Sequence, residues 1–460
     1  MRLVKRLLPI YLLGLFPWLL CGQALAADSQ NLIQIYQQAL SQDPALASAK
    51  SGNLAMQEKL VQGKAQYLPT VNFNAGASAS QTDIKIIGNA PFRNTGRETF
   101  EGYNYGVNLN QPIYRKQIQA QLEQAKSQVE QSDKQLQLAQ QNLILRSSKA
   151  YFDVLLAQDK IELIQAQKNA ISKQLEQAKA NFDVGTATIT DFNEAQARFD
   201  LVQAQEIAAM SDLEVKKRAI QSIIGQMPAT LSGVRSDLQP QMPEPVAMER
   251  WVEMATQTNL MIAIQEQALE IATQEVERQN AGHLPTLDAI ASYTERYANG
   301  GINSFGSDLK DATIGLQLQI PLYQGGAVSS RVREAVANKQ KAMDDVVAAR
   351  RQAELETRQA YLDLVSVVSQ IKAYEQALNS SQSQLDSTSL GYEVGVRTSV
   401  DVLNAQQQFF TAKRDLLQSR YAYLMNILTL KSAVGLLTES DLDAVNQQLV
   451  SQQVVAQKND

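Results

Sequence analysis

Cysteine and histidine are almost absent from this 460-residue chain, which contains one of each. Cys21 lies in the N-terminal apolar segment and follows Leu20, whereas a lipidated cysteine follows a small residue, so we interpret it as hydrophobic filler. His283 cannot form a multi-histidine metal site by itself, and we interpret it as structural. The sequence therefore predicts a mature chain without disulfides, lipid anchor or metal site.

Long apolar runs are absent beyond the N-terminal segment. Residues 1–26 place three basic side chains before an apolar run and end in Ala24-Leu25-Ala26, the small-x-small pattern of a signal-peptidase site, so we predict a signal peptide there. No run of about 18 apolar residues follows, so the sequence predicts no membrane-spanning helix. If the mature chain crosses a membrane, it does so with strands.

Signatures of catalysis and of nucleic-acid binding are absent too. The chain has no glycine-rich phosphate loop and no recognisable pairing of a nucleophile with a base, so we predict no enzyme activity and no cofactor. Removing residues 1–26 takes away three positive charges and no negative ones, so the formal net charge falls from −5 to −8. A negative balance disfavours nucleic acid as a partner.

What the chain does contain is an internal repeat. The stretch YEVGVRTSVDVLNAQ, which begins at Tyr392, closely matches FDVGTATITDFNEAQ, which begins at Phe182, and other short motifs recur at similar offsets. Two copies of one structural unit are therefore expected. The predicted divisions after the signal peptide are a first repeat at 27–226, a linker at 227–249, a second repeat at 250–436, and a C-terminal tail at 437–460 that is disordered from about Ser451.

Each repeat contains a pair of segments in which apolar and polar residues alternate, the period expected of strands. Strands of about ten residues with one apolar and one polar face suit a transmembrane barrel, and a soluble β-sandwich is the alternative. The predicted strands lie at 69–81 and 104–114 in the first repeat and at 285–296 and 311–323 in the second. The stretches 82–103 and 295–311 have the composition of loops and are expected to face the outside of the cell.

The stretches 115–183 and 324–394 contain no proline and are rich in strong helix formers. The first would be about 100 Å long, over three times the apolar thickness of a bilayer, so it must stand in water. Apolar residues at every seventh position predict a coiled-coil seam in it, namely Leu122, Val129, Leu136, Leu143, Ala150, Ala157, Ile164 and Ile171. Shorter helical stretches are expected at 45–66, 188–226, 259–281 and 398–434.

The repeated motif is a helical hairpin, at 183–191 in the first repeat and 393–401 in the second. Gly185 and Gly395 stand where the long helices stop, the usual place for a residue in the left-handed conformation. Thr188-Ile189-Thr190-Asp191 and Thr398-Ser399-Val400-Asp401 both match the capping-box pattern that opens a helix. The chain is therefore expected to reverse at the end of the coiled coil remote from the strands.

The order, spacing and duplication of these motifs resemble the TolC family of outer-membrane channel proteins over essentially all of the mature sequence. The resemblance rests on both hairpins and on the segments Asn31–Asp43, Gly282–Asp288 and Pro321–Gly326. It implies an α+β membrane protein of the Gram-negative envelope: a homotrimer in which four strands per chain form a shared transmembrane β-barrel of about twelve, continuous with a helical coiled-coil tunnel through the periplasm.

By this resemblance the hairpins form the periplasmic gate of the tunnel, with Thr190, Asp191, Tyr392 and Arg397 as its residues. Tyr392 is expected to bond to Asp191, and Arg397 is expected to reach Thr190 and Asp191 of a neighbouring hairpin. The alternative for Asp191 is a capping role alone, and the two roles are compatible.

Asp401 resembles the family's acidic ring at the narrowest point of the tunnel, which favours cations. Asn404 stands where a second acid is expected, so the ring carries fewer charges and should bind blocking cations less strongly. Glu194 occupies the corresponding place in the first repeat.

By the same resemblance, the predicted function is a passive outer-membrane exit duct of tripartite multidrug efflux pumps and type I secretion systems. Its implied partners are a periplasmic adaptor protein, an inner-membrane RND or ABC transporter, and outer-membrane lipid. The substrates and the particular partners are not encoded in any motif. A role of the external loops as a receptor for phage or toxins is suggested by the family resemblance alone. The alternative is a non-conducting trimeric coiled-coil surface stalk, although the duplicated helices and the strands between them argue against one continuous heptad array.

Overall fold

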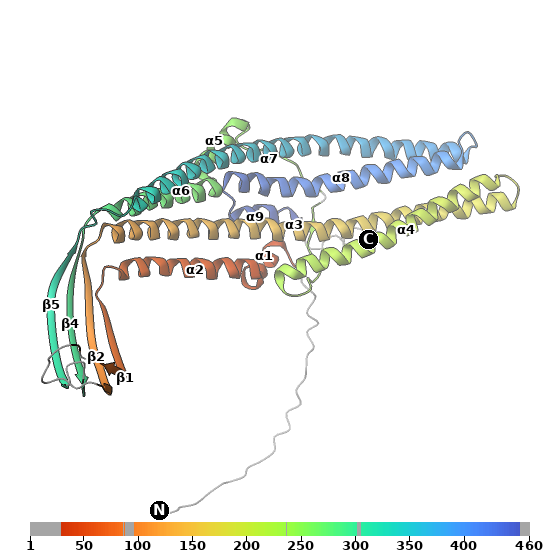
Figure 1. The fold of residues 1–460 in the computed structure, drawn as a ribbon. Helices are drawn as coiled ribbons and strands as arrows, with labels where there is room; N and C mark the ends of the chain where they lie inside the picture. Colours follow the sequence, from red (N-terminus) through yellow and green to blue (C-terminus); the bar gives the residue numbers. More distant parts are fainter. Residues whose placement is uncertain (1–28, 86, 88–95, 236, 301–304, 451–460) are drawn as a thin grey trace, which may run out of the picture.

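The structure is a computed structural model that describes residues 29–85, 87, 96–235, 237–300 and 305–450. A long body of helices extends from one end of a small sheet (Figure 1). In chain order the elements are α1 (Leu32–Gln42), α2 (Pro44–Ala65), β1 (Thr70–Ile84), β2 (Gly96–Tyr114), α3 (Lys116–Asp183), α4 (Ile189–Ile224), β3 (Gly233–Val234), α5 (Met248–Thr258), α6 (Leu260–Asn280), the 3-10 turn η1 (Ala281–His283), β4 (Thr286–Ala298), β5 (Ser307–Gln319), α7 (Ala327–Glu393), α8 (Ser399–Val434), α9 (Glu439–Asn446) and β6 (Leu449–Val450).

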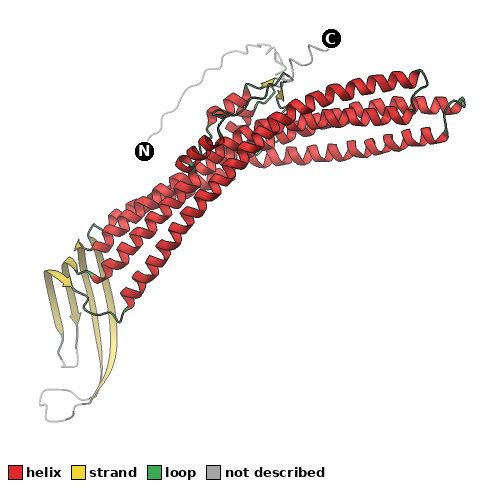
Figure 2. Ribbon diagram, turned by 90° about the horizontal axis from the view of Figure 1, so that it is seen from above, coloured by secondary structure: helices red, strands yellow, loops and turns green. Residues whose placement is uncertain are grey.

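Two helices, α3 and α7, run nearly the whole length of the helical body and fill the stretches 115–183 and 324–394. Two shorter helices follow one another along each of them. α2 and α4 pack on α3, and α6 and α8 pack on α7. Because α6 and α8 also contact α3, the order across the body is α7, then α6 or α8, then α3, then α2 or α4 (Figures 1 and 2). α7 therefore lies at one edge and α2 and α4 at the other.

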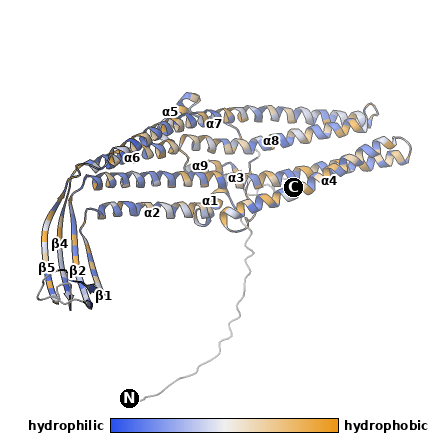
Figure 3. Ribbon diagram, viewed as in Figure 1, coloured by the Kyte–Doolittle hydropathy of each residue, from blue (hydrophilic) through white to orange (hydrophobic). Residues whose placement is uncertain are grey.

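The predicted seam of α3 is buried over its second half. Leu143, Ala150, Ala157, Ile164 and Ile171 are all less than 10% exposed. The first three seam positions are only half-buried. Hydrophilic and hydrophobic residues are mixed along the whole length of the helices (Figure 3). In the described part of the chain, no helix is long and apolar enough to cross a membrane.

The four long strands form one antiparallel sheet in the order β1-β2-β4-β5. Apolar residues of the four strands share one face, and mostly polar residues share the other. On the apolar face, for example, Phe73 of β1 lies opposite Val107 of β2, and Val107 lies opposite Tyr293 of β4. The described residues place no strand against the outer edge of β1 or of β5.

The largest differences from the predicted strand boundaries are in β2 and β5. β2 begins at Gly96 rather than at 104 because charged residues continue the ladder, with Asp83 opposite Arg97. Opposite charges across a strand pair are favourable, although such residues look like a loop in the sequence. β5 ends at Gln319 rather than at 323 because Pro321 has no N–H to donate. The predicted loops at 82–103 and 295–311 are shorter, because β1 ends at Ile84 and β2 begins at Gly96, while β4 ends at Ala298 and β5 begins at Ser307.

The middle of the helical body carries a collar of short elements. α1, α5 and α9 pack there, and β3 pairs with β6. The sequence reading missed α9, which lies in the predicted C-terminal tail and opens with a capping box between Thr438 and Asp441. Leu442 and Val445 of α9 are buried in the main core. These two apolar residues, three positions apart, form too short a pattern to predict a helix from the sequence.

The predicted linker is tied to the long helices by two tyrosines in corresponding motifs. The hydroxyl of Tyr151 on α3 donates to the carbonyl of Ser232 at 2.7 Å, and the hydroxyl of Tyr361 on α7 donates to the carbonyl of Val246. The linker is thus anchored to both halves of the body. The predicted signal peptide, the tail from Ser451 and the centres of both loops lie outside the described residues.

Candidate functional site at the hairpin ends

The two hairpin turns have the same backbone geometry. Gly185 and Gly395 both have φ of +80°, a conformation that costs glycine little and strains other residues. In the first turn the amide of Thr186 donates to the carbonyl of Asn181 at 2.8 Å, and in the second the amide of Val396 donates to the carbonyl of Gly391 at 2.8 Å. These six-to-one bonds close the ends of α3 and α7.

Each returning helix opens with the predicted capping box. The amide of Asp191 donates to the Thr188 hydroxyl at 3.2 Å, and the Asp191 carboxylate accepts the amide of Thr188 at 3.0 Å. Asp401 and Thr398 repeat this exchange at 3.2 and 2.9 Å. The local sequence therefore fixes the two carboxylates at the start of α4 and α8.

Hydrogen bonds to these carboxylates favour their charged forms. The hydroxyl and the amide of Thr188 hold the pKa of Asp191 below its usual range, helped by Ser399. The amide and hydroxyl of Thr398 lower the pKa of Asp401, and the nearby charge of Arg397 adds to the effect. Both acids are therefore negatively charged at neutral pH.

The two hairpins of one chain meet at a surface pocket of about 490 Å³. The structure brings Asp191, Tyr392 and Arg397 together among its lining residues, whereas Thr190 is exposed beside it. The Tyr392 hydroxyl accepts a hydrogen bond from the Asn181 side chain at 3.1 Å.

Within this chain Asp191 has a different partner from the one expected. Its carboxylate accepts from the Ser399 hydroxyl at 3.2 Å rather than from Tyr392. Tyr392 and Asp191 thus each bind the opposite hairpin, through Asn181 and Ser399. The links from Arg397 to Thr190 and Asp191 of a neighbouring hairpin stay a prediction.

A further residue at this end was not singled out by the sequence reading. Arg198 of α4 donates from Nε to the Glu194 carboxylate at 3.2 Å and from Nη2 to the side-chain oxygen of Asn404 on α8 at 3.2 Å. The spacing of Glu194 and Arg198 is a recognisable helical pair. Nothing in the sequence indicates that Asn404, 206 positions away, completes the contact.

Among the described residues no group of three or more His, Cys, Asp or Glu side chains could hold a metal ion. His283 is exposed in η1, between α6 and β4. The geometry at the hairpin ends is therefore that of a polar contact between helices that carries fixed negative charge.

The fold is that of an outer-membrane efflux channel. The family model described as outer membrane efflux protein matches residues 35–226 and 251–436, and the chain belongs to this family. It is accordingly a protein of the outer membrane.

Among its relatives is the outer membrane protein TolC of Vibrio cholerae, which is 34% identical over 96% of this chain and 98% of the relative. The alkaline protease secretion protein AprF of Pseudomonas aeruginosa is 29% identical over 100% of this chain and 95% of the relative. A solved structure of CusC superimposes with a TM-score of 0.76 at 17% identity, covering 88% of this chain and 92% of that one, which supports the fold alone.

Proposed function

We propose that three copies of this chain assemble into one passive exit duct, a β-barrel continuous with a helical tunnel. The observation that carries the proposal is the incomplete sheet. Four strands are about half of the smallest closed transmembrane barrel, and the outer edges of β1 and β5 have no partner among the described residues. Three sheets joined edge to edge give about twelve strands, which is enough to close.

The edges of the helical body support the same assembly. Helices at both edges expose apolar side chains, and burying such residues is favourable. On α7 these are Val336, Met343, Val347, Leu355 and Leu362; on α2 and α4 they are Leu54, Met56, Val61, Leu201, Ile207, Met210 and Val215. An α7 edge packed on the α2 and α4 edge of the next chain covers both stripes and repeats around a ring.

In this proposal the hairpin ends face the inner membrane. Thr190, Asp191, Tyr392 and Arg397 form the gate, and Asp401 forms an acidic ring that favours cations. Partly exposed polar links of this kind are worth about 1 kcal/mol each, so an adaptor and an RND or ABC transporter that bind the tip can supply enough free energy to open it. The duct carries out no chemistry itself, and the transporter supplies energy and selects the efflux or secretion substrate.

The test is single-channel conductance of the purified protein in a planar bilayer. Wild type is compared with the double variant Tyr392→Phe, Arg397→Ser. A matched control, Tyr374→Phe with Arg351→Ser, makes the same changes on α7 away from the tip. The proposal predicts a small, cation-selective wild-type conductance that rises several-fold in the gate variant and stays unchanged in the control.

Two other outcomes contradict parts of the proposal. If wild type conducts freely and the gate variant matches it, the hairpins are helix ends only. If neither protein conducts although both form trimers, the non-conducting stalk is the better description.

A further inference from the structure

The contact between Arg198 and Asn404 joins two helices that otherwise barely touch. α4 packs on α3, and α8 packs on α7, so each hairpin is held together by its own pair of helices. Between α4 and α8 the hydrogen bonds are few: Arg198 to Asn404 at 3.2 Å, and Ser399 to Asp191 at 3.2 Å. α3 and α8 pack on one another along the body, whereas α4 and α8 are joined mainly by these separate polar contacts near the tip.

A buried apolar residue of α8 lies directly beside Asn404 and holds this part of α8 against α3 and α4. Leu403 of α8 is 3% exposed and belongs to a small cluster with residues of α3 and α4. It directly precedes Asn404, so the amide is brought up to α4 by a buried neighbour. Towards the middle of the body Gln167 of α3 donates to Gln407 of α8 at 2.9 Å. Arg198 thus lies in a ladder of polar contacts along the boundary between the hairpins.

We propose that Arg198 and Asn404 form a latch that holds the two hairpins of each chain together and that breaks when the tip opens. This inference rests on the proposed function, and it adds a pair of positioning residues to the gate. Arg198 and Asp191 are seven residues apart, so the latch lies about 10 Å along α4 from the contact between Asp191 and Ser399. Opening must therefore release two levels of contact.

The residue types make this latch weak enough to release. Glu194 occupies one edge of the Arg198 guanidinium and fixes its orientation through the i,i+4 spacing. Asn404 offers a neutral oxygen, so the cross-hairpin bond has a charged donor and an uncharged acceptor. A carboxylate in the same place would form a stronger charge-assisted bond with Arg198. Asn404 therefore limits the strength of the latch as well as the charge near Asp401.

The test uses the full-length trimer in a planar bilayer. Arg198→Ala and Asn404→Ala remove the same bond from its two sides and should each raise the conductance by about two- to fivefold, since a partly exposed link shifts an equilibrium by about that factor. Gln196→Ala is the matched control, because Gln196 bonds to Asp200 on its own helix. If both latch variants match wild type and the control, the latch does not exist.

Asn404→Asp separates the latch from a simple effect of charge. In the presence of Arg198 it should lower the conductance, because the latch becomes an ion pair. In the double variant Arg198→Ala, Asn404→Asp the conductance should rise above that of wild type. The cation selectivity of this double variant, measured from the reversal potential, should be stronger than that of Arg198→Ala. Equal effects of Asn404→Asp with and without Arg198 would overturn the proposal.

Failure of the latch and failure of the duct give different results. If Tyr392→Phe, Arg397→Ser opens the channel and Arg198→Ala does not, the duct stands and the latch is rejected. If no variant conducts, the duct itself is rejected, and the latch, which rests on it, is rejected with it.

Discussion

The two long helices, α3 and α7, have almost the same length, 68 and 67 residues, and corresponding places in the chain, yet their surroundings differ. The motif Ala-Tyr-Phe-Asp on α3 corresponds to Ala-Tyr-Leu-Asp on α7. Phe152 of the first motif is 2% exposed, whereas Leu362 of the second is 56% exposed. The same position in one local pattern is therefore core in one helix and surface in the other.

The difference follows from where each helix lies in the body. α3 is central and has α2, α4, α6 and α8 packed around it, and Phe152 lies against the ring of Tyr421 on α8 with the ring centroids 6.0 Å apart. α7 lies at the edge, with α6 and α8 along one side and the short helix α5 against its middle. The apolar side chains of α3 are thus covered within the chain. Those of α7 need a second copy to cover them.

The largest expected effect comes from placing a charge on the exposed apolar surface of α7, at the edge of the helical body. Leu362→Asp should abolish the trimer while leaving the chain helical, because three carboxylates would have to be buried without partners. Migration of the unboiled protein on a denaturing gel, with circular dichroism in detergent, measures both properties. Gln352→Asp is the control, since it places the same charge at another exposed position of α7, beside Glu356.

A trimer that survives Leu362→Asp with wild-type heat stability would break the comparison. It would mean that Leu362 faces solvent in the assembly and that α7 is not the edge that another copy covers.

Truncating the corresponding residue of α3 should act inside one chain. Phe152→Ala removes a buried ring and is expected to lower the free energy of unfolding by about 3–5 kcal/mol. Its effect on the melting temperature should not depend on protein concentration, whereas that of Leu362→Ala should, because only the second changes an interface between copies. Thermal unfolding in detergent at several protein concentrations measures both. Equal concentration dependence in the two variants would show that Phe152 and Leu362 do not differ in whether they are buried within one chain or between copies.

The sequence was sufficient for what depends on local chemistry. The lengths of α3 and α7 follow from the absence of proline, and Gly185 and Gly395 mark the turns through the conformation that glycine adopts easily. The capping boxes of Asp191 and Asp401 were visible because all their parts lie within four residues. Such features need no knowledge of the packing of distant segments.

Features that depend on contacts across the chain were not visible. The period of seven residues identifies an apolar stripe on a helix but not what covers it, so the difference between Phe152 and Leu362 could not be read from it. Arg198 resembled any surface arginine with an acid four positions before it. Its contact with Asn404 depends on how two hairpins pack, and no local pattern records that.

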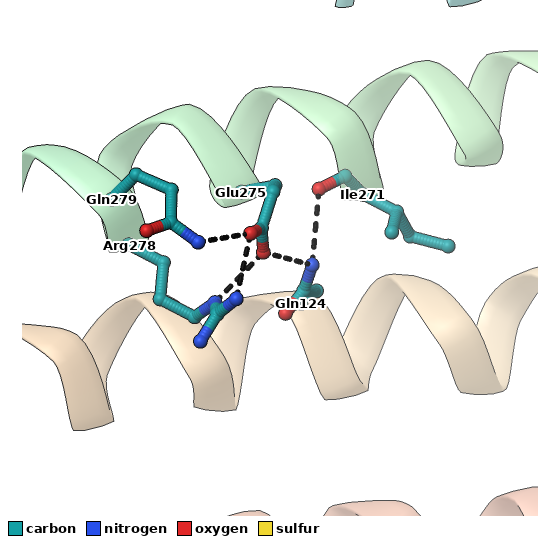
Figure 4. A network of polar contacts seen from close by, with 5 residues as sticks. All are labelled: Gln124, Ile271, Glu275, Arg278 and Gln279. Atoms are coloured by element: carbon teal, nitrogen blue, oxygen red, sulfur yellow. Dashed lines mark hydrogen bonds and ion pairs between the residues drawn. The ribbon is translucent and has the colours of Figure 1, made fainter. Parts of the chain in front are cut away.

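The contact of α3 with α6 adds a weaker, pH-dependent element on the same central helix. Figure 4 shows the Glu275 carboxylate of α6 accepting hydrogen bonds from Arg278, Gln279 and Gln124, the last of which belongs to α3. The Arg278 guanidinium is the main cause of a lowered pKa for Glu275, about 2, with the two glutamines adding to the effect. The charged carboxylate is therefore the form that joins the two helices.

The smallest expected effect follows from this pKa. Because it lies below the ordinary value of 4.5, the carboxylate contributes its full stability above pH 4.5 and loses it as the pH falls towards 2. The Glu275 side chain is partly exposed, so the contribution is about 1 kcal/mol after screening. Glu275→Gln should thus lower the melting temperature at pH 7 and match wild type near pH 2, whereas Glu270→Gln, an exposed change on the same helix, should differ little from wild type at neutral pH. If Glu275→Gln lowers the melting temperature by the same amount near pH 2 as at pH 7, Glu275 acts through packing. The contact between α3 and α6 would then not depend on its charge.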